Sequence, residues 1–130
     1  MIQNLEYGEA VQGFDAVAFF DGKAKKGLHG ISSTYNEAKY HFSSHINKDK
    51  FDQSPDKYTP QYGGFCSIAM SEGAQAQPNP KSFLIQDGKL YLFTMMFFGI
   101  IDAKRQWVKD PKGKQTLADA EWSKMNSLKI

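Results

Sequence analysis

Two residue types that often carry function are scarce in this chain. Its 130 residues include one cysteine, Cys66, and one arginine, Arg105. A single cysteine excludes an intramolecular disulfide and any zinc site that needs two thiolates from one chain. Arginine is the usual bidentate reader of bases and phosphates. Because the net charge is also only +2, we expect no nucleic-acid partner.

Long hydrophobic runs are missing as well. The longest apolar run covers residues 95–101, beginning at Met95 and ending at Ile101. It is far shorter than the roughly 20 residues of a membrane helix, so no membrane span is expected. Residues 1–12 lack a basic segment followed by an apolar stretch, and no secretory signal is visible. This slightly favours the cytoplasm, although a domain without disulfides is compatible with any compartment.

What the chain does contain is enough apolar material for a core. Hydrophobic residues make up 41% and aromatic residues 14% of the sequence, which fits one domain of ordinary size. There is no internal repeat and no low-complexity tract. The composition therefore argues against disorder.

Hairpins and helices follow one another without a regular strand–helix–strand rhythm. Turn signals at Asn36-Glu37 and Asp87-Gly88 predict two hairpins. The strands are expected at residues 31–35, 39–42, 82–86 and 89–94. Helices are expected from a Ser43 or Ser44 cap through residue 51, and at 65–72, 101–109 and 116–128. In the last helix, Ala118, Trp122 and Met125 share one face that should dock onto the sheet. The predicted class is α+β, a small antiparallel sheet of hairpins packed with three to four short helices.

The segment PQYGGFC at residues 60–66 is the most informative motif. Gly63 and Gly64 allow a positive φ and a close backbone approach. If a helix begins near Gly64 or Phe65, Cys66 lies in its first turn, where a thiolate is stabilised. The alternative is a small buried hydrophobic residue, since free cysteine is among the most buried residue types.

Several side chains are candidates for a site around Cys66. Tyr58, Tyr62 and Phe65 either stack on a flat ligand or fill the core. His41 and His45 are surface or structural residues unless the fold brings them to Cys66, in which case copper or zinc is a candidate ligand. If Tyr40 and Phe42 face the core, His41 points toward solvent or a neighbouring element. His29, in a glycine-flanked stretch, carries little signal.

Two further features bear on structure and assembly. Asp15 either orients a donor near the site or caps a turn, and the cap is preferred. Strand alternation cannot hide both faces of residues 95–101, so part of this run should be buried against another element, a ligand or another subunit. Methionine-rich apolar surfaces often mark interfaces, and we expect a homodimer through this segment.

The chain resembles YHS-domain proteins over about residues 13–110. The matching landmarks are GFDAVAFF at 13–20, DGKA at 21–24, KG at 26–27, YN at 35–36, YHF at 40–42, Phe51, SPDKY at 54–58, PQYGGFC at 60–66 and DGKLYL at 87–92. No single landmark is decisive, but their order and spacing are specific. The resemblance implies an N-terminal extension at residues 1–12 and a single YHS-like domain at 13–130.

The wider YHS and TRASH-like group is associated with heavy metals held by cysteines. The resemblance aligns those cysteines with Ala18, Ser43 and Asn47, which are poor ligands for soft ions. That soft-metal site is therefore not expected here. What remains is a stand-alone branch with the Gln-Tyr-Gly-Gly-aromatic-Cys motif, which has no settled activity. Some of its proteins carry selenocysteine at the position of Cys66, which implies redox or nucleophilic chemistry, and many carry an export signal.

Three functions remain open from the sequence. The favoured one is a non-catalytic module that binds a metal or small ligand, with Tyr58, Tyr62, Gly63, Gly64 and Phe65 around Cys66. The second is a redox or nucleophilic enzyme that uses the thiol of Cys66. The third is an interaction domain in which Cys66 only packs. The first is favoured because no base is placed near the thiol and no second thiol exists.

Overall fold

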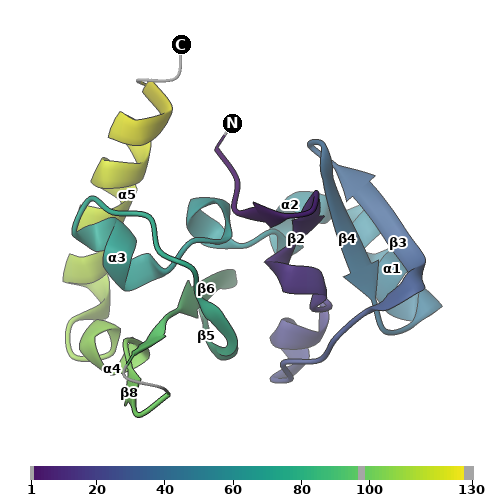
Figure 1. Cartoon of the computed structure of the whole chain (residues 1–130), viewed down its shortest axis with the longest axis horizontal. Helices are drawn as coiled ribbons and strands as arrows, with labels where there is room; N and C mark the ends of the chain where they lie inside the picture. Colours follow the sequence, from purple (N-terminus) through teal and green to yellow (C-terminus); the bar gives the residue numbers. More distant parts are fainter. Residues whose placement is uncertain (1, 97–98, 128–130) are drawn as a thin grey trace.

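Short strands and short helices alternate irregularly along the chain, as the predicted α+β class requires. The computed structural model describes residues 2–96 and 99–127. Within these ranges there are five α-helices, one more than the upper end of the expected number, and three small sheets. Figure 1 shows the hairpin of residues 79–93 between two groups of elements: the N-terminal sheet with the helices at residues 45–53 and 55–58, and the helices at residues 67–71, 104–107 and 111–127.

The N-terminal sheet is built around a tight hairpin. Its strands are β1 (Leu5–Glu6), β2 (Glu9–Ala10), β3 (Leu28–Tyr35) and β4 (Ala38–Phe42), in the order β1-β2-β4-β3. The turn residues Asn36 and Glu37 both have positive φ, as a two-residue hairpin turn requires. Strand β2 pairs in parallel with β4. The sheet is therefore mixed, and part of the N-terminal segment belongs to it.

Helices α1 (His45–Gln53) and α2 (Pro55–Tyr58) follow β4. The Ser44 hydroxyl caps α1 by accepting a hydrogen bond from the Asn47 N–H at 3.1 Å, which confirms the predicted start. Phe51 of α1 is buried against Tyr40 and Phe42 of β4, with ring centroids at 4.7 and 5.1 Å. Helix α1 thus covers the apolar face of β4, and α2 contacts α1 and the strand Lys89–Phe93.

The second hairpin, β5 (Asn79–Gln86) with β6 (Lys89–Phe93), confirms the prediction for residues 82–94. Because side chains alternate along a strand, β6 contributes to two cores. Its Leu90 and Leu92 belong to the first core cluster, and its Tyr91 and Phe93 belong to the second. The first cluster otherwise consists of Ala10, Val11, Phe14, Ala16, Val17, Phe19, Ala38, Tyr40, Phe42, Phe51 and Tyr58. The second otherwise consists of Tyr62, Cys66, Ile68, Met70, Ala103, Trp107 and Ala118.

The C-terminal helices surround the second core cluster. They are α3 (Ser67–Ser71), α4 (Lys104–Trp107) and α5 (Pro111–Ser127). Ala118 is fully buried, and Trp122 and Met125 pack against the cluster, which confirms the predicted buried face. The expected docking onto the sheet is not what the structure shows, because α5 packs chiefly on α3 and on the turn at residues 61–64. Helix α5 begins five residues earlier than expected, because Pro111 starts the helix instead of blocking it. The Asp110 carboxylate supports this start by accepting the Gly113 N–H at 3.2 Å.

The expected helix at 101–109 is wrong in its first residues. Ile101–Asp102 is strand β8, which pairs with β7 (Met95–Met96), and only Lys104–Trp107 is helical. Within the apolar run 95–101, Met95 and Met96 are half-buried and Ile100 is 78% exposed. Phe97 and Phe98, part of the expected dimer segment, lie outside the described residues. In the described ranges, no helix has the length and apolar character needed to cross a bilayer.

Candidate functional site

The motif at residues 60–66 folds as a sharply turned segment beside β6. Tyr62, Gly63 and Gly64 all have positive φ, which confirms the backbone role predicted for the glycines. A Cβ on Gly63 would lie 2.6 Å from the Ile2 carbonyl oxygen and 2.9 Å from the Trp122 ring. The glycine is therefore required for close packing between the N-terminal segment and α5.

The Cys66 thiol is enclosed in the second core cluster. The side chain is 1% exposed, and Sγ accepts a hydrogen bond from the Thr94 N–H at 3.2 Å. Helix α3 begins at Ser67, so Cys66 is its N-cap residue. The expectation that Cys66 lies in the first turn of the helix is therefore wrong. The arrangement corresponds to a small packed residue with one weak hydrogen bond.

The aromatic residues predicted around Cys66 are divided between the two cores. Tyr58 belongs to the first core cluster, where its ring contacts Phe20 at a centroid distance of 5.0 Å. Tyr62 and Phe65 pack in or against the second. The Tyr62 hydroxyl donates to Asp119 at 2.8 Å. Burial, reinforced by that hydrogen bond, raises the pKa of Tyr62 well above its ordinary value of 10. Tyr62 is therefore a neutral, anchored side chain.

Asp15 lies at the centre of a buried polar network and is itself fully buried. Its Oδ1 accepts the N–H groups of Val17 and Ala18 at 2.9 and 3.2 Å, which is the predicted turn cap. Its Oδ2 accepts from the backbone N–H and hydroxyl of Ser43, at 2.8 and 2.7 Å, and from Asn47 Nδ2 at 2.9 Å. These donors satisfy the carboxylate without a counter-ion.

The three positions that the resemblance aligned with metal-binding cysteines thus meet around Asp15. Ala18 offers only a backbone N–H, and Ser43 and Asn47 direct donors toward the carboxylate. A soft metal ion needs thiolate ligands, whereas these positions supply N–H and O–H groups that donate hydrogen bonds to a carboxylate. These residues therefore do not fit the heavy-metal site of the cysteine-containing proteins that the sequence resembles.

His41 is the centre of a different group. Its ring points away from the side of β4 that carries Tyr40 and Phe42, as predicted, and toward β2 and β3. His41 Nε2 lies 2.8 Å from Glu9 Oε1, and His29 Nδ1 lies 3.8 Å from the same oxygen. The ligand atoms of Glu9, His29 and His41 all lie within 4.8 Å of one another. Two imidazoles and a carboxylate are a ligand set that binds zinc or copper.

The local structure explains why these side chains converge. A Cβ on Gly27 would lie 2.3 Å from the His41 carbonyl carbon, so only glycine lets the start of β3 approach β4 this closely. The His41 side chain is 2% exposed, whereas that of His29 is 90% exposed. His41 Nδ1 is buried and has no hydrogen-bond partner among the described residues. The group thus combines a fixed buried ligand with an accessible one.

The expected trio of Cys66, His41 and His45 is not the group that the structure assembles. His45, the first residue of α1, is exposed, and in residues 2–96 and 99–127 the group of Glu9, His29 and His41 contains neither His45 nor Cys66. No motif in the sequence marked Glu9 or His29 as a metal ligand. Each of the two has a titratable side chain, which was the only signal that the sequence offered. They meet His41 because β2 pairs with β4, and this pairing is a tertiary feature.

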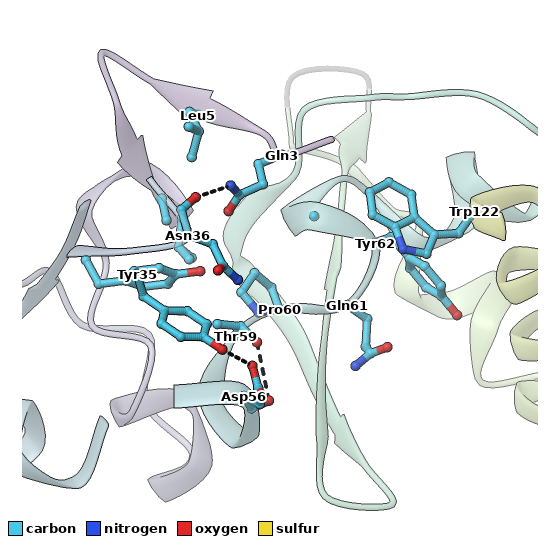
Figure 2. Close-up of a pocket in the computed structure, with 14 residues that line it drawn as sticks. Gln3, Leu5, Tyr35, Asn36, Asp56, Thr59, Pro60, Gln61, Tyr62 and Trp122 are labelled. Carbon is cyan, nitrogen blue, oxygen red and sulfur yellow. Dashed lines mark hydrogen bonds between the residues drawn. The ribbon is translucent and has the colours of Figure 1, made fainter. Parts of the chain in front are cut away.

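A pocket with a volume of about 190 Å³ opens where the two core clusters meet. It is lined from the N-terminal sheet by residues that include Tyr35, Asn36 and Tyr40, and from the motif by Gln61, Tyr62 and Gly63. Figure 2 shows Tyr35 and Asp56 joined in one part of the pocket, with Tyr62 and Trp122 in another. Of the residues predicted to bind a ligand, Tyr62 and Gly63 line this pocket, whereas Tyr58, Gly64, Phe65 and Cys66 are not among its lining residues.

Comparisons with other proteins returned nothing that identifies the chain. No protein-family model, curated protein or solved structure matches it.

Proposed function

We propose that this chain is a non-catalytic metal-binding module of the YHS-like kind, and that Glu9, His29 and His41 bind a zinc or copper ion. The observation that carries the proposal is the convergence of three ligand atoms within 4.8 Å. Chelation of a zinc or copper ion needs only small shifts from these separations, because the exposed His29 ring is free to adjust. The proposed metal site therefore does not include Cys66, the residue at which the sequence favoured a metal or small ligand.

The mixture of burial in this group supports a binding role. The buried His41 ring is held by β4 and by Glu9, so one ligand is already oriented before the metal arrives. The exposed His29 leaves an approach from solvent. Three protein ligands leave at least one coordination position for water or for a ligand from another molecule.

The YHS-like assignment rests on the ordered landmarks in the sequence. It is supported by the meeting of Ala18, Ser43 and Asn47 around Asp15, since positions that share a metal in the relatives should be neighbours in space. In this chain those positions hold a hydrogen-bonded carboxylate. The heavy-metal function of the cysteine-containing relatives is therefore not part of the proposal.

Metal titration tests the proposal directly. Zinc chloride and copper(II) chloride are titrated by calorimetry into wild type and into His29→Ala, with His45→Ala as the matched control. Both histidines are exposed, so neither change should affect folding. We expect one saturable site in wild type and in His45→Ala, and an affinity lower by about tenfold or more in His29→Ala. No saturable binding to wild type, or equal affinity in His29→Ala, would overturn the site.

Cys66 has a structural role in this proposal. Its 1% exposure and its place in the second core cluster favour packing over thiol chemistry. Titration of Cys66→Ser provides the test, because a variant that still folds should bind zinc as wild type does. A specific loss of zinc binding in folded Cys66→Ser would restore Cys66 as a ligand.

We also propose a homodimer through residues 95–101 and no nucleic-acid partner. The exposed Ile100 and the partly exposed Ile101 support an apolar contact at this end of the molecule. Lysine makes up nearly all of the positive charge, and Arg105 is the single arginine. This supports the absence of a nucleic-acid partner, because arginine is the usual reader of bases and phosphates. Analytical ultracentrifugation at micromolar concentration tests the dimer, and a single monomeric species would refute it.

A further inference from the structure

The pocket between the two core clusters has a chemistry of its own. Among residues 2–96 and 99–127, Asp56 is the only formally charged residue that lines it, and no lysine or arginine of these ranges is in the lining. An anionic ligand would therefore have no counter-charge, whereas a cationic ligand would have one. The pocket also brings together the aromatic side chains Tyr35, Tyr40, Tyr62 and Trp122.

The Asp56 carboxylate is available for such a ligand. Its Oδ1 accepts a hydrogen bond from the Tyr35 hydroxyl (Figure 2). In the described part of the chain Asp56 forms no salt bridge, and its Oδ2 accepts no hydrogen bond. The neighbouring Lys57 lies instead over the Tyr58 ring, 5.2 Å from its centroid. One carboxylate oxygen of Asp56 therefore has no partner in the part of the chain that the structure describes.

Tyr40 supplies an independent indication that the pocket is built for a ligand. Its side chain is 2% exposed and lines the pocket, yet its hydroxyl has no hydrogen-bond partner among the described residues. Within those residues, only His41 Nδ1 and Ser67 Oγ are sealed from solvent without a partner. The Tyr40 oxygen therefore reaches the open space of the pocket. A nearly buried hydroxyl that lacks a protein partner is best satisfied by water or by a ligand.

From these observations we infer that the pocket binds a small organic cation of the amine or quaternary ammonium class. Aromatic rings attract such cations through their negative faces, and a carboxylate at the rim completes the recognition. One carboxylate is too few ligands for calcium, which takes six to eight oxygens. The volume of about 190 Å³ is below the range for drug-sized ligands and limits the ligand to a few carbons.

The inference is independent of the metal site. Alternation places Tyr40 and Ala10 toward the pocket, whereas the neighbouring His41 and Glu9 face each other away from it. Binding at the pocket should therefore survive His29→Ala, and metal binding should survive changes at Asp56. Failure of one proposal is thus distinguishable from failure of the other.

Choline and its neutral carbon isostere 3,3-dimethyl-1-butanol are the probes. The two molecules differ in charge and not in shape, so the ratio of their affinities measures the contribution of the positive charge to binding. Binding is followed by backbone amide shifts of Asn36, Gln61 and Gly63, all of which line the pocket. We expect choline to shift these amides with a Kd on the order of 1 mM and the neutral isostere to bind at least about tenfold more weakly.

Three variants complete the experiment. Asp56→Asn removes the charge at an exposed position, and Asp52→Asn is its control, because Asp52 is also an exposed carboxylate but does not line the pocket. Asp56→Asn should weaken choline binding by about tenfold, and Asp52→Asn should not change it. Tyr40→Phe, which keeps the ring, should retain cation binding. Equal binding of choline and its isostere, no shifts at the pocket, or an unchanged affinity in Asp56→Asn would each overturn the inference.

Discussion

Removal of the Asp15 carboxylate should destabilise the fold more than any other single change of a charged residue among those described. The side chain is fully buried and accepts five hydrogen bonds, from Val17, Ala18, Ser43 and Asn47. These bonds tie the turn after Asp15 to the segment that begins α1. Asp15→Asn keeps the shape but places an amide N–H₂ among groups that are themselves donors.

The size of the effect follows from the environment of the donors. A hydrogen bond to a charged group typically contributes about 1.5–3 kcal/mol, and a buried donor left without its acceptor costs about 1–3 kcal/mol. Ser43 and Asn47 are half-buried, so water can reach part of the network after the change. We therefore expect a loss of about 3 kcal/mol for Asp15→Asn, against a total stability of roughly 5–15 kcal/mol for a domain.

Urea denaturation followed by tryptophan fluorescence measures this loss. Trp107 is fully buried in the second core cluster, whereas Asp15 contacts elements around the first. Because β6 contributes side chains to both clusters, the two should unfold together, and the fluorescence should report the damage. With a urea m-value of about 1.5 kcal/mol/M, the midpoint should fall by about 2 M.

The control is Asp21→Asn, a change at an exposed carboxylate in the same part of the chain. Its midpoint should stay within roughly 0.3 M of wild type. If the midpoint of Asp15→Asn also stays within that margin, the network contributes little and the reasoning is refuted. If the midpoint falls but fluorescence and circular dichroism no longer coincide, the coupling of the two cores through β6 is refuted.

Three further predictions concern other parts of the structure. The Cys66 thiol should resist iodoacetamide until the chain unfolds, and rapid alkylation of the native protein would show that the thiol is accessible. Burial is the main cause that raises the pKa of Tyr91 to about 12. The folded state therefore keeps a proton that the unfolded chain releases near pH 10, so the stability from this group is present below pH 10 and lost between about pH 10 and 12. Tyr91→Phe should make the free energy of unfolding less dependent on pH in that window. If the slope of this free energy against pH is unchanged, Tyr91 is not the source of the dependence. Gly27→Ala should cost about 2 kcal/mol because its Cβ would collide with the backbone of His41, whereas Gly30→Ala, whose Cβ meets open space, should stay within about 0.5 kcal/mol by thermal or urea denaturation.

Local chemistry made much of the fold predictable. Asp87-Gly88 between two apolar strands predicted the β5–β6 hairpin, and both turn residues have the positive φ that this turn requires. The hydroxyl of Ser44 predicted the start of α1. In both cases the determining interaction lies within a few residues of the chain, so it can be read without knowing the rest of the molecule.

Where a local signal had two meanings, only the tertiary structure decided. Pro111 was compatible with the end of one helix or the start of the next, and the packing of α5 on the second core cluster selected the start. The thiol of Cys66 was compatible with a reactive or a packed residue. The second core cluster, in which the thiol is buried, combines residues close in sequence with residues of β6, α4 and α5 far along the chain.

The candidate sites themselves were beyond the reach of the sequence. Glu9, His29 and His41 are separated by about 20 and 12 residues, and they meet because β2 pairs in parallel with β4 and Gly27 lets β3 approach. The sequence by itself determined the types of ligand that this protein could offer: one thiol, three histidines and fourteen side-chain carboxylates. The tertiary structure decided which of them meet, because convergence depends on long-range strand pairing and close packing, which no local pattern encodes.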